Sequence, residues 1–183
     1  MLKPTKITAE VEVARDRDRS ATIRATVETP DGRSHEWVYS KTPDAVIVLA
    51  FDAAGRLAVK REWRLGRKDF TWELPSGWAG SLDRPVAPAE AAERELREEV
   101  GVTGQLRKIG EFFQSNHATT KFHVFVAEQL REAPLPPDED EHVESCFLPL
   151  DAARERLLRE QTPAAQVLCA VAVFDADANR RRR

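Results

Sequence analysis

Several features that would assign a protein class at once are scarce or missing in this sequence of 183 residues. Only two cysteines occur, Cys146 and Cys169. Both have apolar neighbours, so we expect buried free thiols and neither a disulfide framework nor a cysteine metal site. No apolar run approaches the roughly 20 residues of a membrane span, so we expect no membrane partner. The first residues are charged throughout, which differs from a signal peptide and predicts a cytoplasmic location.

An excess of positive charge is also missing. The chain has 28 Lys and Arg against 31 Asp and Glu, a formal net charge of −3, so we expect no nucleic-acid partner. The arginine run at 180–183 is too short to change this, and residues 176–183 are predicted to be a disordered basic tail. Hydrophobic residues make up 42% of the chain, which is enough for the core of one domain with a small appendage.

The first part of the chain has the pattern of a small β unit. Residues 5–14 alternate apolar and polar side chains, and residues 21–27 and 35–39 read as a hairpin whose turn contains Gly32. We therefore predict an antiparallel β unit over residues 1–42. Because it has few large apolar side chains, it is expected to pack on the rest of the chain or on a second copy, as in a homodimer.

The remaining chain mixes strands and helices without a regular alternation, which predicts an α+β fold with helices on the faces of a mixed sheet. This domain is assigned to residues 43–175. Strands are predicted at 45–51, 56–63, 70–74, 105–113, 122–128 and 143–148, helices at 88–100, 150–160 and 163–174, and a loop at 78–87.

The clearest helix, over residues 88–100, carries three acids on one side. On a helical wheel Glu95, Glu98 and Glu99 lie within about 100° of arc and border the apolar stripe. Acids at such spacing repel one another, and a hard divalent cation turns that repulsion into attraction. Taken alone, a solvated acidic face balanced by Arg94 and Arg97 is the commoner interpretation.

The residues around these acids favour the metal interpretation. Residues 94–102 read R-E-U-x-E-E-x-G-U, where U is aliphatic, and this segment resembles the second half of the Nudix box at every fixed position. The lead-in Glu-Leu-Pro-Ser-Gly at 73–77 also resembles the Nudix pattern, which extends over roughly residues 40–175. The resemblance implies a Nudix-like α/β/α sandwich with a mixed sheet.

The first half of the box departs from the pattern. Val86 stands where the box glutamate is expected if Gly80 is the box glycine. In the preferred alternative Gly77 is the box glycine, the loop has three extra residues, and Asp83 stands in for the glutamate. The departure leaves the number of metal ions open.

The resemblance implies roles for individual residues. Glu98 and Glu99 would be catalytic metal ligands, with Glu95 as a third ligand, and the metal would be Mg²⁺ or Mn²⁺. Arg94, Gly77 and Gly101 would be structural, Arg94 by pairing with a helix carboxylate. Metal-assisted hydrolysis of a pyrophosphate would follow, in which water attacks one phosphorus and the other phosphate leaves.

The N-terminal β unit resembles the extra region of ADP-ribose pyrophosphatases and nucleotide-sugar relatives, which typically helps to build a homodimer. The resemblance implies that Trp37 stacks on a base, although packing in the dimer interface or in the core is as good an interpretation. It also implies that Arg64 contacts the diphosphate rather than lying free at a strand end. Glu141, with Glu139 as the next candidate, would be the general base on an acidic loop that is otherwise merely solvated.

The substrate expected from this resemblance is a nucleoside diphosphate linked to another group. The leading expectation is ADP-ribose, cut to AMP and ribose 5-phosphate. Residues 115–120 lack the proline that ADP-ribose hydrolases often carry there, which leaves GDP-mannose or another nucleotide sugar as an alternative. A non-catalytic Nudix-like nucleotide sensor is a third possibility, although such sensors often lose the helix glutamates that are intact here.

Overall fold

The computed structural model describes residues 3–136, 142–159 and 162–182. The elements in chain order are β1 (Lys6–Asp16), β2 (Ser20–Glu28), β3 (Ser34–Lys41), β4 (Ala45–Ala50), β5 (Leu57–Arg64), β6 (Asp69–Glu73), β7 (Ser76–Trp78), α1 (Pro88–Glu99), β8 (Val102–Phe113), β9 (Lys121–Glu132), β10 (Val143–Leu148), α2 (Leu150–Leu158) and α3 (Ala165–Arg181).

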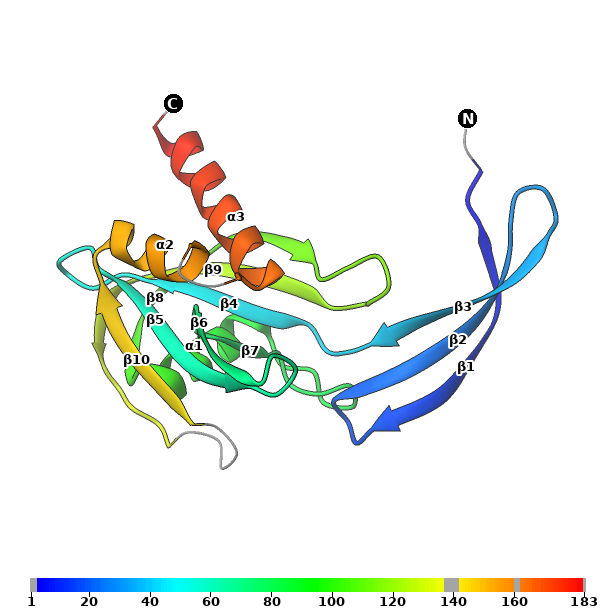
Figure 1. The fold of residues 1–183 in the computed structure, drawn as a ribbon, viewed down its shortest axis with the longest axis horizontal. Coiled ribbons are helices and arrows are strands. Elements are labelled where there is room, and N and C mark those ends of the chain that lie inside the picture. Colours follow the sequence, from blue (N-terminus) through cyan, green and yellow to red (C-terminus); the bar gives the residue numbers. More distant parts are fainter. Residues whose placement is uncertain (1–2, 137–141, 160–161, 183) are drawn as a thin grey trace.

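Two sheets form the central layer of the main domain. One has the order β7-β4-β9-β8 and is mixed, because β4 runs parallel to β9 and antiparallel to β7. The other has the order β10-β5-β6 and is antiparallel. Helix α1 lies on one side of this layer, and α2 and α3 lie on the opposite side (Figure 1). The α+β sandwich expected from the sequence is therefore confirmed.

Strand β4 is buried on both faces, and this explains its unbroken apolar sequence. Its residues Ala45, Ile47 and Leu49 belong to the core cluster under α2 and α3. The alternate residues belong to a second cluster, which includes apolar residues of α1 (Val46, Val48 and Ala50 of β4 with Ala91, Ala92 and Leu96 of α1). Because side chains of a strand alternate between faces, one short segment fixes α1 against the sheet from which the site is built.

The N-terminal residues form a separate three-stranded antiparallel sheet, β1-β2-β3, that extends away from the main domain (Figure 1). Its central strand is buried at alternate positions from Ala21 to Val27. Large apolar side chains elsewhere on this sheet are exposed, among them Ile7, Val11 and Val38. The predicted β unit is present, and its role in dimerisation stays a prediction.

The C-terminal segment and one cysteine differ from the sequence expectations. The predicted disordered tail is wrong for residues 176–182, because α3 continues to Arg181. Asp177 on that helix accepts a hydrogen bond from Arg107 of β8 at 3.0 Å. Cys169 is exposed rather than buried, because the buried side of α3 is formed by Val167, Ala170 and Val171; Cys146 is partly buried. In the described part of the chain, no helix combines the length and apolar character needed to cross a membrane.

Candidate active site

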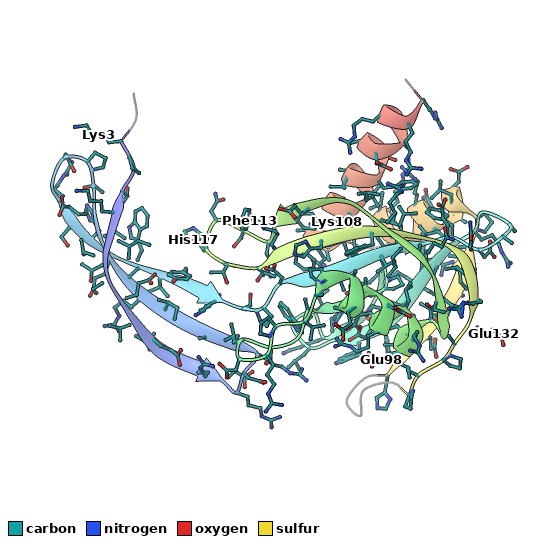
Figure 2. The ribbon with its side chains drawn as sticks, turned by 180° about the vertical axis from the view of Figure 1, so that it is seen from behind. Lys3, Glu98, Lys108, Phe113, His117 and Glu132 are labelled. Carbon is teal, nitrogen blue, oxygen red and sulfur yellow. The ribbon has the colours of Figure 1, made fainter. Side chains whose placement is uncertain are left out.

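Helix α1 places the three acids at the boundary between the core and the surface. In its last hydrogen bond, the backbone N–H of Val100 donates to the carbonyl of Leu96 at 3.1 Å, and Gly101 follows with a φ of +78°. That left-handed backbone suits glycine and ends the helix as expected. Glu95 and Glu99 lie on the buried face, only 5% and 6% exposed. Figure 2 shows Glu98 on the side of the sheets opposite α2 and α3.

Glu95 is held by the lead-in strand β7 and by its own neighbour. A Cβ atom at Gly77 would lie 2.2 Å from the carboxyl carbon of Glu95, so any other residue here would displace the Glu95 carboxylate from its present position. Arg94 donates from Nη2 to Glu95 Oε1 at 2.6 Å and to the carbonyl of Trp78 at 3.1 Å, and its Nε lies 3.3 Å from Glu98 Oε2. Arg94 therefore pairs with helix carboxylates, as its position in the box implied.

Glu99 is bound from two sides. The backbone N–H of Ser76 donates to Glu99 Oε2 at 3.0 Å, and Lys60 Nζ donates to Glu99 Oε1. Lys60 is 1% exposed and also donates to Glu62 Oε2 at 2.9 Å. Lys60 is not among the site residues predicted from the sequence. The available signal is the alternation of Lys60, Glu62 and Arg64 along β5, which puts three charges on one face of a strand that begins Leu-Ala-Val.

Arg64 continues this network across to β6. It donates from Nε and Nη2 to the two carboxylate oxygens of Glu73 at 2.9 and 2.6 Å, and from Nη1 to Glu62 at 2.8 Å. Thr71 donates to Glu73 at 2.8 Å. The guanidinium of Arg64 is thus bonded to carboxylates, and its contact with a diphosphate stays a prediction.

Burial changes the acid–base properties of these groups. Removal from water raises the pKa of Glu99 to about 8, against the opposing attraction of Lys60. Burial also raises the pKa of Glu95, and the nearby Glu98 adds to the rise. For Glu73, the bonds from Arg64 outweigh burial and hold the pKa below its usual value. Two of the helix acids therefore lie where a negative charge is poorly solvated and an added cation would stabilise it.

The donor set suits a hard divalent cation. Mg²⁺ and Mn²⁺ prefer carboxylate oxygens and retain water ligands, and Glu95, Glu98 and Glu99 offer such oxygens from one helix face. No compact group of three metal-binding side chains is found among residues 3–136, 142–159 and 162–182, and the acids are bonded to Arg94, Lys60 and the Ser76 backbone. The chemistry of the residues fits the metal that the Nudix box implies.

Two clefts meet at Glu98. The first has a volume of ≈ 390 Å³ and is lined by Asp18, Arg19, Gly77, Trp78, Gly80, Ser81, Arg84, Arg94, Glu95 and Glu98. The second has a volume of ≈ 440 Å³ and is lined by Arg61, Phe70, Glu98, Glu99, His142, Val143 and Glu144. A ligand bound at Glu98 can therefore extend into either cleft.

The other predicted site residues are more dispersed. Trp37 lies on β3, 55% exposed, and neither it nor Arg64 is among the described residues that line the two clefts. Glu141 and Glu139 lie outside the described residues, although the adjoining His142 lines the second cleft. Phe70, which is not among the predicted site residues, is 47% exposed and lines the second cleft with Glu98 and Glu99.

The residues of the first half of the box lie apart from the helix acids. Asp83 pairs with Arg15 of β1 at 3.2 Å and lines neither described cleft, and its replacement of the box glutamate stays a prediction. Val86 packs against the apolar cluster that contains Leu96. Within the described residues, the acids that line the two clefts come from α1, from the β1–β2 turn (Asp18) and from β10 (Glu144).

Comparisons with known proteins agree with this geometry. The NUDIX domain model matches residues 41–171. An ADP-ribose pyrophosphatase of Bacillus subtilis (strain 168) is 37% identical over 131 residues, which cover 69% of each chain. A methanol dehydrogenase activator of Bacillus methanolicus is 29% identical over 149 residues, 79% of each chain.

Two further comparisons extend the picture. A CMP-5'-(N-acetyl-N-hydroxy-3-aminopropyl)phosphonate hydrolase of Streptomyces rubellomurinus (strain ATCC 31215) is 28% identical over 140 residues, 75% of this chain and 66% of the relative. The crystal structure of an ADP compounds hydrolase shares the fold with a TM-score of 0.83 at 22% identity, covering 99% of this chain and 97% of the other. The matched family model, the helix glutamates and the fold agree: the chain belongs to the Nudix family and is a Nudix pyrophosphohydrolase.

Proposed function

We propose that the protein hydrolyses ADP-ribose to AMP and ribose 5-phosphate in a reaction that depends on a divalent metal ion. The observation that carries the proposal is the position of Glu98, which borders two clefts and lies beside two buried acids on the same helix. The similarity to an ADP-ribose pyrophosphatase supports ADP-ribose among the possible nucleoside diphosphate derivatives.

Glu95, Glu98 and Glu99 would hold Mg²⁺ or Mn²⁺, which supplies charge neutralisation of the pyrophosphate oxygens and activation of a water molecule. The chain's own residues orient these ligands. Arg94 restrains Glu95 and Glu98, while the Ser76 backbone and Lys60 hold the two oxygens of Glu99. Such fixed orientation reduces the reorganisation that ligand binding would otherwise require.

Substrate contacts are proposed on both sides of the acids. Phe70 in the second cleft offers an aromatic face, and Arg61 lies over its ring at 4.9 Å. Trp37 is proposed to stack on a base, and Arg64 to contact the diphosphate once substrate draws it from Glu73. Glu141 is proposed as the general base, since His142, the next residue along the chain, lines the cleft beside Glu99.

A nucleotide sugar such as GDP-mannose is the second candidate substrate. It is favoured by the segment 115–120, which contains no proline, and by the similarity to a relative named for hydrolysis of a CMP derivative. A non-catalytic nucleotide sensor is the third candidate, and the intact helix acids weigh against it.

The experiment is a hydrolysis screen with purified protein. ADP-ribose, GDP-mannose and a CMP-linked compound are incubated with Mg²⁺, with Mn²⁺ or with EDTA, and the released nucleotides are identified. We expect AMP from ADP-ribose, with either metal and not with EDTA. GMP as the dominant product would select the second candidate, and nucleotide binding without cleavage of any substrate would select the sensor.

We further propose that the protein is a homodimer assembled through the N-terminal sheet. The sheet has no helix packed on it among the described residues, and Ile7, Val11, Trp37 and Val38 are exposed. Burial of such side chains would contribute roughly 25 cal/mol per Å². Analytical ultracentrifugation at micromolar concentration tests the proposal, and a monomer there would contradict it.

A further inference from the structure

The loop between β7 and α1 forms a small hairpin rather than an open connection. Gly80 pairs with Pro85, and the backbone N–H of Ser81 donates to the carbonyl of Arg84 at 3.0 Å. Gly80 has a φ of +82°, and a Cβ atom there would lie 2.2 Å from the Arg84 carbonyl. The hairpin therefore requires glycine at this position and has a defined shape.

This hairpin is attached to the N-terminal sheet. The backbone N–H of Leu82 donates to the carbonyl of Asp18 in the β1–β2 turn at 2.7 Å, and Arg15 pairs with Asp83 at 3.2 Å. The turn reaches the main domain at this point (Figure 1). The residues that lengthen the Nudix-box loop thus hold the β1–β2 turn beside α1.

The β1–β2 turn, the hairpin and α1 all contribute residues that line the first cleft. Two arginines of this lining have no anionic partner among the described residues. Arg19 comes from the turn and Arg84 from the hairpin, and both side chains are exposed. Within the described residues, neither guanidinium forms a hydrogen bond or an ion pair. Arg94 of α1, which lines the same cleft, is in contrast bonded to Glu95.

We propose that Arg19 and Arg84 form an anion subsite that binds a phosphate group of the diphosphate substrate. The inference rests on the proposed function and gives the N-terminal sheet a role in the active site of its own chain. A guanidinium fork matches phosphate geometry and carries a permanent charge. Because Glu98 borders this cleft, a diphosphate bound through a metal ion at the helix acids would extend toward the two arginines. Asp18, which also lines this cleft, reduces the net positive charge of the subsite, and the remaining charge suits a single phosphate group.

Steady-state kinetics with ADP-ribose and Mg²⁺ test the subsite in Arg19→Gln, Arg84→Gln and the double variant. Each single substitution is expected to raise KM about threefold to tenfold and to leave kcat within about twofold, because the contact is made in both ground and transition states. Arg17→Gln is the matched control, since it removes the same charge from the same turn at a residue outside the described cleft lining.

Calorimetry with inorganic pyrophosphate and metal-free protein in EDTA supplies a readout that does not depend on hydrolysis. We expect the double variant to lose measurable binding and Arg17→Gln to retain it, with all variants folded by circular dichroism. If the parent cleaves no nucleotide but its pyrophosphate binding still requires Arg19 and Arg84, the proposed function fails and the subsite stands. The subsite is overturned if the parent binds no pyrophosphate, or if the double variant behaves like Arg17→Gln in both KM and binding.

Discussion

The N-terminal sheet and the main domain differ in the solvent exposure of their ion pairs. On the sheet, Arg15 pairs with Glu12 at 2.9 Å, and both side chains are in contact with water. In the main domain, Lys60 and Glu99 pair with almost no exposure, and Glu62, Arg64 and Glu73 continue the network. Exposed pairs contribute little because water solvates the separated charges, whereas a buried charge without its partner is costly. Among the described residues, buried pairs thus fix charge geometry in the main domain, whereas the Arg15–Glu12 pair on the sheet is exposed.

The largest effect is expected at the helix acids. Glu98→Gln and Glu99→Gln keep the side-chain shape and remove a negative ligand, so each should lower kcat/KM by about a thousandfold, or roughly 4 kcal/mol of transition-state stabilisation. Metal-dependent turnover on ADP-ribose measures this. Near-parental activity of either variant on both ADP-ribose and GDP-mannose would refute the metal-ligand assignment.

The Lys60→Met variant tests how much the buried ion pairs of the main domain contribute to stability. The variant leaves Glu99 and Glu62 without their shared ammonium group, and we expect the free energy of unfolding to fall by about 3 kcal/mol above pH 8, where the Glu99 carboxyl of the parent is ionised. Urea denaturation without metal measures the loss, and Mg²⁺ should restore part of it by supplying positive charge near Glu99. A variant as stable as the parent without metal would show that the pair is energetically neutral.

The stability at acid pH tests the ion pair between Glu73 and Arg64 in the main domain. The pKa of this carboxyl is lowered in the folded protein from an ordinary value of 4.5, so its contribution is present above pH 4.5 and is lost as pH falls through the lower folded value. Glu73→Gln should cost about 2 kcal/mol at pH 7. The difference from the parent should shrink below pH 4.5, and a difference independent of pH would contradict the ion-pair explanation.

On the N-terminal sheet, Trp37 is the residue whose substitution is expected to change substrate affinity. If Trp37 stacks on a base, Trp37→Ala should raise KM for ADP-ribose about tenfold without a comparable change in kcat. A Phe substitution at the same position should retain most of the affinity. If Trp37 serves only an interface, the alanine variant will instead shift the sedimentation coefficient and leave KM unaltered at saturating dimer concentration.

The smallest effect is expected at the exposed pair. Glu12→Gln removes the ion pair with Arg15 on the sheet surface, and the thermal midpoint should stay within experimental error of the parent. A clear loss of stability would show that the sheet, too, depends on fixed charges. Together with Lys60→Met, this variant sets the two ends of the comparison.

Local patterns determined much of this protein in advance. The period of apolar residues predicted α1 and the alternating strands, and the signature at residues 94–102 identified the helix acids and the family. Gly101 was recognised as the helix stop because its chain position and backbone requirement are local properties. These features depend on neighbours within a few residues, and such relations are visible in the sequence itself.

Tertiary structure alone decided which distant groups meet. Lys60 and Glu99 are 39 positions apart, and only the packing of β5 beside α1 brings them together in a place without water. The hairpin at residues 80–85, read from the sequence as an ordinary loop, gains its meaning from a hydrogen bond to Asp18 in the N-terminal turn. Burial and pairing between separate elements depend on the whole fold, so composition and spacing could not reveal them.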